Sequence, residues 1–378
     1  MSAWYKQSEE KLGLADGLMK ALKSIERDSQ RGKIVEQFAP ILQAKMIFES
    51  NLIEGAGEQL GQTQRIVQEY FPTIPAQVNV YQELIESKGG VDNLFSRDSL
   101  KLLKRIVKSN GANPKVVTPS IKFEGKSKSF KEVAQHNAAI TYAQGLSTSY
   151  STNKTLRYIR KIARDKEKDA STRQAYASVI KSFLEDIKQS RIRREKLLTT
   201  SKLLTLHRII ASRLLPPDCK TKAGKYRVED ITVPGANITF TPWTLLGPTM
   251  KRFLENADNV LDNCKSFSDY QIAAARISHE FVKIHPFPDF NGRLSRIIMN
   301  MILWSANPKY ELCVAIRGDG KNKRKYFMAL DRANNGDFRA LTTIVAEGFI
   351  SNVDELDRHF SAAGLKTIRS EASILVPK

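Results

Sequence analysis

The chain has 378 residues, of which 41% are hydrophobic and 26% charged, a composition that suits a globular protein of one to three domains with a large buried core. No apolar run reaches the roughly 20 residues of a membrane-spanning helix, and the three cysteines, Cys219, Cys264 and Cys313, lie far apart, so we expect no membrane span, disulfide framework or cysteine zinc cluster and a reducing, cytoplasmic location. The net charge of +20 is strongly basic and directs attention to acidic or nucleic-acid partners.

The N-terminal region, residues 1–142, is predicted to be helical. It starts with a charged stretch that lacks the apolar segment of a signal peptide. Ser50 and Glu54 lie one helical turn apart on the same face, and Gly55 is suited to end a helix. By itself this pattern is most simply a solvated glutamate before a terminating glycine.

Residues 143–196 are predicted to form an inserted helical hairpin with a basic surface. Basic side chains gather between Lys154 and Lys168 and again between Lys188 and Lys196. Basic helix faces are usually only solvated, but this excess could also provide weak, sequence-independent binding to nucleic acid or to an acidic partner.

Strand-forming patterns are scarce, so the fold is predicted to be mainly α. The exception is a predicted hairpin in which residues 226–233 and 237–240 are short β-prone runs around the turn residues Pro234 and Gly235. The exposed edge of such a hairpin could hold an extended target segment by strand addition.

Two helices are predicted around residues 285–291. Residues 270–284 and 292–304 both carry apolar residues at helical spacing. Pro286 and Pro288 separate them and end the first helix. The intervening residues therefore form a turn that leads into the N-terminus of the second helix.

The chemistry of this turn suits a phosphate-bearing ligand. The first amides of a helix lack internal partners and favour an anion, and Arg293 and Arg296, three residues apart, project from one side of the first turn. Asp289 is unexpected beside phosphate-binding groups unless a cation lies between, and magnesium fits because it takes one or two carboxylates together with substrate phosphates. His285 has a pKa suited to general-base work near neutral pH.

The segment from His285 to Arg296 resembles the Fic family signature, His-Pro-Phe-x-Asp/Glu-Gly-Asn-Gly-Arg-x-x-Arg. It departs from that pattern at Phe290, where the family usually has a glycine that lets the backbone approach the phosphates. The resemblance implies transfer of AMP from ATP to a protein hydroxyl. It also implies catalytic roles for His285 and Asn291 and a nucleotide-binding loop of Phe290, Asn291, Gly292, Arg293 and Arg296.

Three further segments are similar to parts of the same family. Ser50, Glu54 and Gly55 resemble an inhibitory motif, Ser/Thr-x-x-x-Glu-Gly/Asn, whose carboxylate would occupy Arg296 in the subgroup with an N-terminal inhibitory helix. The hairpin resembles the family's target-binding flap. A downstream segment resembles the one that receives adenine. The implied flap residues are Tyr226, Arg227, Val228, Ile231 and Val233, and the implied adenine-binding residues are Tyr326, Phe327 and Asn334.

The chain is therefore expected to be an all-helical Fic core at 197–350, followed by a helix and tail at 351–378. The resemblance implies an autoinhibited protein adenylyltransferase that uses ATP and magnesium, with Asp289 as the metal ligand, and modifies a Ser, Thr or Tyr hydroxyl of a protein. Two alternatives stay open: an enzyme that removes AMP, with Glu54 positioning water, and a basic nucleic-acid-binding protein whose core only senses nucleotide. The sequence does not indicate an oligomeric state.

Overall fold

The computed structural model describes residues 3–26, 29–70, 127–163, 196–211, 214–215, 222–233, 238–307 and 310–375. These residues are helical or irregular and include no β-strand, so the mainly α class is confirmed, whereas the predicted hairpin is not seen in the described parts of residues 226–240. The helices are α1 (Ala3–Ser24), α2 (Gln30–Ile53), α3 (Leu60–Tyr70), α6 (Lys128–Ala163), α8 (Thr200–Ala211), the 3-10 turn η3 (Trp243–Leu245), α9 (Leu246–Asn263), α10 (Phe267–Ile284), α11 (Asn291–Ala306), α12 (Gly320–Asn334), α13 (Arg339–Ala362) and α14 (Ile368–Leu375). None of the described helices has both the length and the apolarity to cross a membrane.

The chain divides into two compact units. Residues 1–73, 118–144 and 198–378 form the first, and residues 74–117 and 145–197 form the second. The two domain boundaries predicted after residues 142 and 350 lie inside α6 and α13. Most of the predicted basic insertion, residues 164–195, lies outside the described residues. The first unit carries the predicted catalytic loop.

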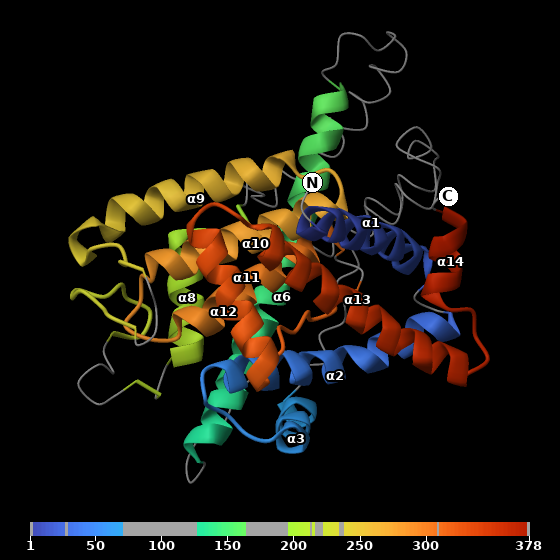
Figure 1. Cartoon of the computed structure of the whole chain (residues 1–378), viewed down its shortest axis with the longest axis horizontal. Coiled ribbons are helices and arrows are strands. Elements are labelled where there is room, and N and C mark those ends of the chain that lie inside the picture. Colours follow the sequence, from blue (N-terminus) through green and yellow to red (C-terminus); the bar gives the residue numbers. More distant parts are fainter. Residues whose placement is uncertain are drawn as a thin grey trace, which may run out of the picture. The chain divides into compact units, whose positions relative to one another are not determined.

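Helix α11 is the core helix of this unit. Every residue of α11 except Gly292 is buried, and the helix packs against α10 and also contacts α2 (Figure 1). A helix that is buried on all sides must satisfy its polar groups internally. Asn300 does so by bonding the backbone of Val314, whose N–H lies 2.7 Å from the Asn300 Oδ1 and whose carbonyl lies 3.0 Å from its Nδ2.

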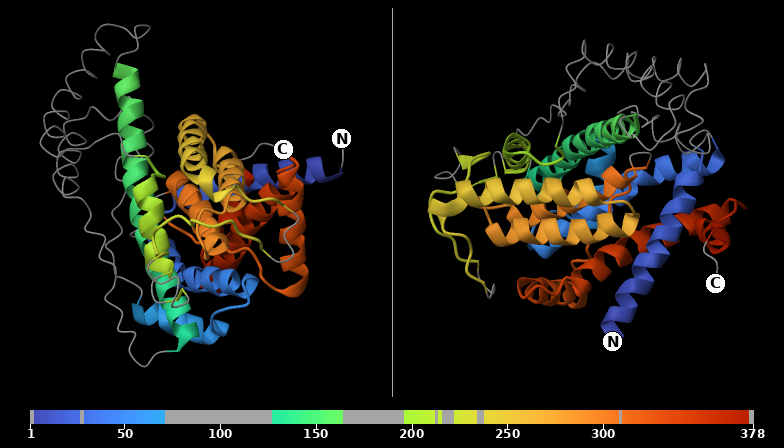
Figure 2. Two further views of the ribbon diagram at one scale, coloured as in Figure 1. Left: turned by 90° about the vertical axis from the view of Figure 1, so that its left-hand side faces the viewer. Right: turned by 90° about the horizontal axis from the view of Figure 1, so that it is seen from above.

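Helix α10 leads into the loop before α11. It begins with a capping box, in which Ser266 Oγ accepts from the Asp269 amide while the Asp269 carboxylate accepts from the Ser266 amide. A short link joins α9 to α10, and the two helices lie alongside each other (Figure 2). Helix α10 ends at Ile284 and His285 is its C-cap, so the C-terminus of α10 and the N-terminus of α11 face the same short loop.

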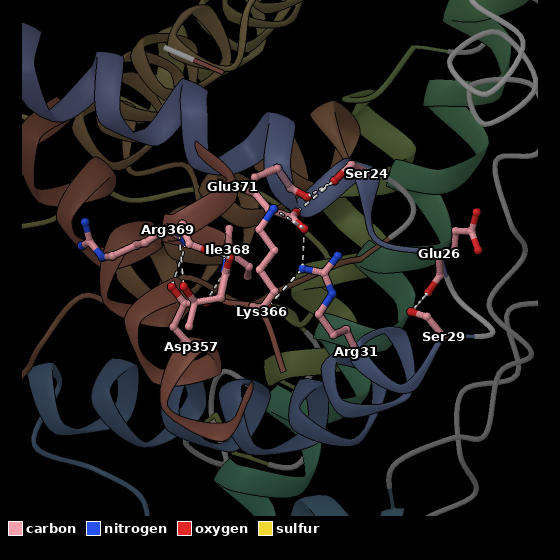
Figure 3. A network of polar contacts seen from close by, with 12 residues as sticks. Ser24, Glu26, Ser29, Arg31, Asp357, Lys366, Ile368, Arg369 and Glu371 are labelled. Atoms are coloured by element: carbon pink, nitrogen blue, oxygen red, sulfur yellow. Dashed lines mark hydrogen bonds and ion pairs between the residues drawn. The ribbon is translucent and has the colours of Figure 1, made fainter. Parts of the chain in front are cut away.

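The C-terminal helix α14 is fastened to the rest of this unit by polar contacts (Figure 3). Asp357 of α13 accepts hydrogen bonds from the amides of Ile368 (2.6 Å) and Arg369 (3.0 Å), which lie at the start of α14. Arg31 of α2 forms an ion pair with Glu371 at 2.8 Å. A carboxylate at a helix N-terminus satisfies free amides and complements the helix dipole, so Asp357 caps α14 from a neighbouring helix.

Candidate active site

His285 sits at the C-terminus of α10 in a left-handed conformation, with φ 54° and ψ 58°. For a residue other than glycine this conformation costs roughly 1–3 kcal/mol and persists only where neighbouring contacts hold it. The Nδ1 atom lies 2.9 Å from the Val282 carbonyl. Because a carbonyl can only accept, Nδ1 carries the proton and Nε2 is left as the basic nitrogen.

The pKa of His285 is lowered from its ordinary value. Burial is the largest cause, followed in the same direction by the positive charge of Arg227, while the Val282 carbonyl and the charges of Glu54 and Asp289 act against the shift. A lowered pKa keeps the imidazole neutral at pH 7. His285 is therefore in the form that can accept a proton.

The loop after His285 is closed by Asn291 and anchored by Phe287. The Asn291 side chain accepts from the Phe287 amide (3.0 Å) and donates to the Phe287 carbonyl (2.7 Å). The Phe287 ring is fully buried and stacks on His207, with centroids 3.9 Å apart and planes within 4°. Burial lowers the pKa of His207 to about 4, so His207 stays neutral and accepts from the Gly224 amide at 2.8 Å. In this structure Asn291 shapes the loop, and a contact with phosphate stays a prediction.

Arg296 is paired with the end of α2. Its Nε donates to Ser50 Oγ (2.8 Å), and its Nη2 donates to the Ser50 carbonyl (3.0 Å) and to Glu54 Oε1 (2.5 Å). Both Arg296 and Ser50 are buried. Burial alone would raise the pKa of Glu54, but the charge of Arg296 and its hydrogen bond, with smaller contributions from Arg293 and Lys323, hold that pKa below its ordinary value. The expected contact between Glu54 and Arg296 is therefore present and ionised.

The Glu54 carboxylate also covers the N-terminus of α11. A β-carbon added to Gly292 would collide with Glu54 Oε1, so that carboxylate lies directly against the first turn of α11. Gly55 follows with φ 66°, which lets the chain turn away immediately after α2. A free helix N-terminus attracts anions. Glu54 thus occupies a position where a phosphate would find both helix amides and Arg296.

Arg293, one turn earlier on α11, has different partners. Its guanidinium lies over the Phe290 ring, 4.1 Å from the ring centroid, and its Nη1 is 3.9 Å from Glu132 Oε1 on α6. Phe290 itself adopts φ 65°, a conformation that glycine reaches without strain. The backbone thus keeps the shape expected for the usual glycine, while the added ring forms a cation–π contact with Arg293.

Asp289 is exposed, and its Oδ1 accepts from the Phe290 amide at 2.5 Å. No group of three or more His, Cys, Asp or Glu side chains among the described residues could hold a metal alone. One exposed carboxylate beside a helix N-terminus nevertheless fits magnesium, which takes its other ligands from water and substrate phosphates.

The predicted adenine-binding residues do not form one cluster. Tyr326 is buried, and its hydroxyl accepts a hydrogen bond from Arg296, so it supports the arginine end of the site. Phe327 is 45% exposed. Asn334 Oδ1 lies 3.0 Å from His279 Nε2, and it is about 12 Å further along α12 than Tyr326. Their role in holding a base stays a prediction.

The predicted flap residues also differ in their surroundings. Val228 is 57% exposed, whereas Arg227 is 4% exposed. The Tyr226 ring packs against Phe287, with centroids 5.6 Å apart. Ile231 and Val233 are half-buried. The turn at 234–237 lies outside the described residues. Arg227 is therefore buried in this structure, and a role of these residues in binding a target stays a prediction.

Three residues next to the site were not predicted from the sequence. Glu132 faces Arg293 and accepts from the Gly57 amide at 2.9 Å. The Phe240 ring lies 4.5 Å from the His285 ring, centroid to centroid. His136 is fully buried beside Asn51. Burial, and then the positive charges of Arg293 and Arg296, hold the pKa of His136 well below its ordinary value. All three reach the site from segments remote in sequence, and none carries a local motif.

Comparison with known proteins matches the same segment. The Fic/DOC family model covers residues 197–303. A Fido domain-containing protein of Dictyostelium discoideum is 37% identical over 109 residues, which are 29% of this chain and 72% of that protein. The protein named protein adenylyltransferase Fic of Culex quinquefasciatus is 29% identical over 157 residues, 41% of this chain and 28% of that longer protein. This chain therefore matches less than a third of the length of the Culex protein.

Structural similarity extends further along the chain. A crystal structure of a Fic-domain-containing signaling protein of Bacteroides thetaiotaomicron superposes with a TM-score of 0.56, covering 93% of this chain and 99% of that one. The two sequences are 13% identical, so this likeness concerns the fold alone.

Proposed function

The chain belongs to the Fic/DOC family, and from this premise we propose that it is an autoinhibited protein adenylyltransferase. It would transfer AMP from ATP to a Ser, Thr or Tyr hydroxyl of a target protein. The observation that carries the proposal is the arrangement of one loop, in which a neutral histidine with a free Nε2 precedes a helix N-terminus carrying two buried arginines.

In the proposed reaction the target hydroxyl oxygen attacks the α-phosphorus of ATP and forms a phosphoester bond. The bond from the α-phosphorus to the bridging oxygen breaks, and pyrophosphate leaves with its electrons. His285 Nε2 accepts the hydroxyl proton. The amides at the start of α11 stabilise charge on the α-phosphate, and Arg293 and Arg296 bind the β- and γ-phosphates. Magnesium, held by Asp289, would neutralise phosphate charge when bound.

Autoinhibition follows from the position of Glu54. Its carboxylate forms an ion pair with the Arg296 guanidinium and lies against Gly292. ATP could then bind only with its terminal phosphate displaced, and the α-phosphorus would not present its in-line face to the hydroxyl. Positioning dominates catalysis of phosphoryl-type transfer, so a displaced pose costs rate even where nucleotide still binds.

The same position of Glu54 supports a second candidate, hydrolytic removal of AMP. A carboxylate beside the α11 N-terminus lies where it could orient a water molecule toward a phosphoester. The two activities predict opposite effects of one substitution: Glu54→Gly would raise transfer but abolish removal.

The experiment uses the full chain carrying Glu54→Gly, incubated with magnesium and each of ATP, GTP, CTP and UTP, alone and with a cell lysate. Intact mass then shows which group is transferred to the chain itself, and labelled nucleotide shows targets in the lysate. The matched control carries both Glu54→Gly and His285→Ala. Absence of transfer from every nucleotide by a folded protein that binds ATP would exclude the adenylyltransferase proposal.

A further inference from the structure

Arg227 links three segments of backbone around the catalytic loop. Its Nε donates to the His285 carbonyl (2.8 Å), its Nη1 donates to the Glu229 carbonyl (2.8 Å), and its Nη2 donates to the Thr241 carbonyl. Its own amide donates to the Pro286 carbonyl at 2.9 Å. The side chain is 4% exposed. A single buried side chain therefore joins residues 227–229 to both Thr241 and the peptides that follow α10.

The contact with His285 has a clear physical logic. The last carbonyls of a helix lack internal partners and form its negative end, so a guanidinium there caps the helix and complements its dipole. His285 also has the strained left-handed backbone, which needs several contacts to hold it. Arg227 fixes the carbonyl of His285, in the peptide that directly follows the His285 Cα, and the carbonyl of Pro286 one peptide further on, so it holds the backbone from which the imidazole projects.

We propose that Arg227 is a positioning residue for His285, holding the imidazole at the orientation and in the neutral form that proton transfer requires. This inference rests on the proposed function, and it replaces the target-binding role implied for Arg227 by resemblance. The charged groups that act on the imidazole are Arg227, Glu54 and Asp289. The positive charge of Arg227 is the one that disfavours the imidazolium, and it does so from a fixed distance because each of its three side-chain nitrogens donates to a backbone carbonyl.

Two substitutions separate the effect of Arg227 on the orientation of His285 from the effect of its charge on the protonation of His285. Arg227→Lys keeps the charge but offers one compact ammonium in place of a planar fork, so it cannot bond three carbonyls in the same way. Arg227→Gln removes the charge and keeps an amide donor. Both are introduced into the Glu54→Gly chain, so that inhibition does not mask the rate.

The first readout does not depend on activity. The pKa of His285 is measured by NMR titration of the labelled full chain, with its signal assigned by its loss in His285→Gln. Arg227→Gln should raise this pKa, whereas Arg227→Lys should leave it near the parent value. His279, whose ring nitrogen lies 3.0 Å from Asn334 Oδ1 of α12, provides the internal control and should titrate alike in every variant that is folded.

The second readout is AMP transfer. Arg227→Lys should lower kcat by roughly 10–100-fold, the usual cost of misplacing a catalytic group by about 1 Å, while KM for ATP stays within about twofold. Arg227→Gln should in addition move the acidic fall of the pH–rate profile to higher pH. The inference is overturned if both variants keep the parent's kcat and His285 pKa. If Glu54→Gly itself transfers nothing, the proposed function fails, yet the titration still tests Arg227.

Discussion

The loop between α10 and α11 has a base at one end and two arginines at the other, and the structure leaves these ends in different states. At the base end, His285 Nδ1 is bound to Val282 and its pKa is lowered by burial, so Nε2 stands ready to accept a proton. At the arginine end, the Arg296 guanidinium is already hydrogen-bonded to Ser50 and Glu54. The contrast teaches that inhibition would act on the substrate's pose and leave the base intact.

The largest effect is expected from removing the base, which tests whether the two ends of the loop have separate roles. In the Glu54→Gly chain, His285→Ala should lower AMP transfer by roughly 10²–10⁴-fold, the usual contribution of a general base. ATP binding should stay within about twofold, because the arginine end is untouched. Single-turnover transfer and calorimetric ATP binding measure the two effects. Near-normal transfer by the folded mutant would remove His285 from the mechanism.

The next effect comes from opening the arginine end. Glu54→Gly should raise transfer by about 5–150-fold, the span of a coupling of about 1–3 kcal/mol. Glu54→Asp should give a smaller gain, since its shorter arm reaches Arg296 less well. Adding Arg296→Ala to Glu54→Gly should cancel the gain. Incorporation of labelled AMP by these proteins at equal concentration is the measurement, and equal rates for parent and Glu54→Gly would make residues 50–55 an ordinary helix end.

The proposed inhibition by Glu54 has a pH dependence of definite sign. Because Arg296 holds the pKa of Glu54 below its ordinary value of 4.5, the carboxylate stays ionised throughout the neutral range. The ion pair contributes above that value and is lost only as the pH falls through the lowered pKa. The ratio of Glu54→Gly to parent rates should therefore be constant between about pH 6 and pH 8. A ratio that falls toward 1 at pH 6 would show that another group controls the inhibition.

Part of this site could be predicted from the sequence because its chemistry is local. The residues from His285 to Arg296 are contiguous in the sequence. Within them Arg293 and Arg296 are three residues apart, and Ser50 and Glu54 are one turn apart, so spacing alone predicts that each of these two sets lies on one side of its helix. The pairing of the two sets, remote in sequence, came from family resemblance, and the structure shows that contact at 2.5 Å. The helical class could be predicted from periodicity, since buried faces repeat at helical spacing.

The rest depends on contacts between distant segments, for which a sequence has no local signal. Glu132 meets Arg293 only because α6 passes the start of α11. Resemblance alone implies a target-binding role for Arg227, and the sequence has no signal that this residue is buried while its neighbour Val228 is exposed. Tyr326, for which resemblance implies a role in binding adenine, also contacts Arg296, and that contact has no signal in the sequence. Each difference reflects packing that local propensity does not determine.

A smaller effect on ATP binding is expected from substituting Phe290, whose ring contacts the guanidinium of Arg293. A partly buried cation–π contact contributes about 0.5–2 kcal/mol, so its loss should weaken ATP binding by about 2–30-fold. In the Glu54→Gly chain, Phe290→Leu removes the aromatic face but keeps an apolar side chain, and Phe290→Tyr keeps the face as the matched control. AMP binding should be unaffected by either, because Arg293 is proposed to hold the outer phosphates. Equal ATP affinity for the leucine and tyrosine variants would show that the ring does not position Arg293.

The smallest effect on the chemistry should come from the basic residues far from the loop in sequence. If the contrast between the two ends of the loop is local, reversing Arg191, Arg193 and Arg194 to glutamate should leave AMP transfer by the Glu54→Gly chain within about twofold, because the contacts that hold His285 and Arg296 come from Val282, Ser50 and Glu54. The same reversal should weaken binding to a fluorescent DNA duplex of arbitrary sequence and reduce its salt dependence, because each lost phosphate contact removes about 0.9 from the slope of log affinity against log salt. Fluorescence anisotropy between 50 and 200 mM salt measures the slope, and an Arg→Lys triple variant is the control that keeps the charge.

Two outcomes would contradict these expectations. If the parent fails to bind the duplex even at the lowest salt, the nucleic-acid interpretation of the +20 charge is wrong. If the reversal changes AMP transfer more than tenfold, the difference between the two ends of the loop is not local.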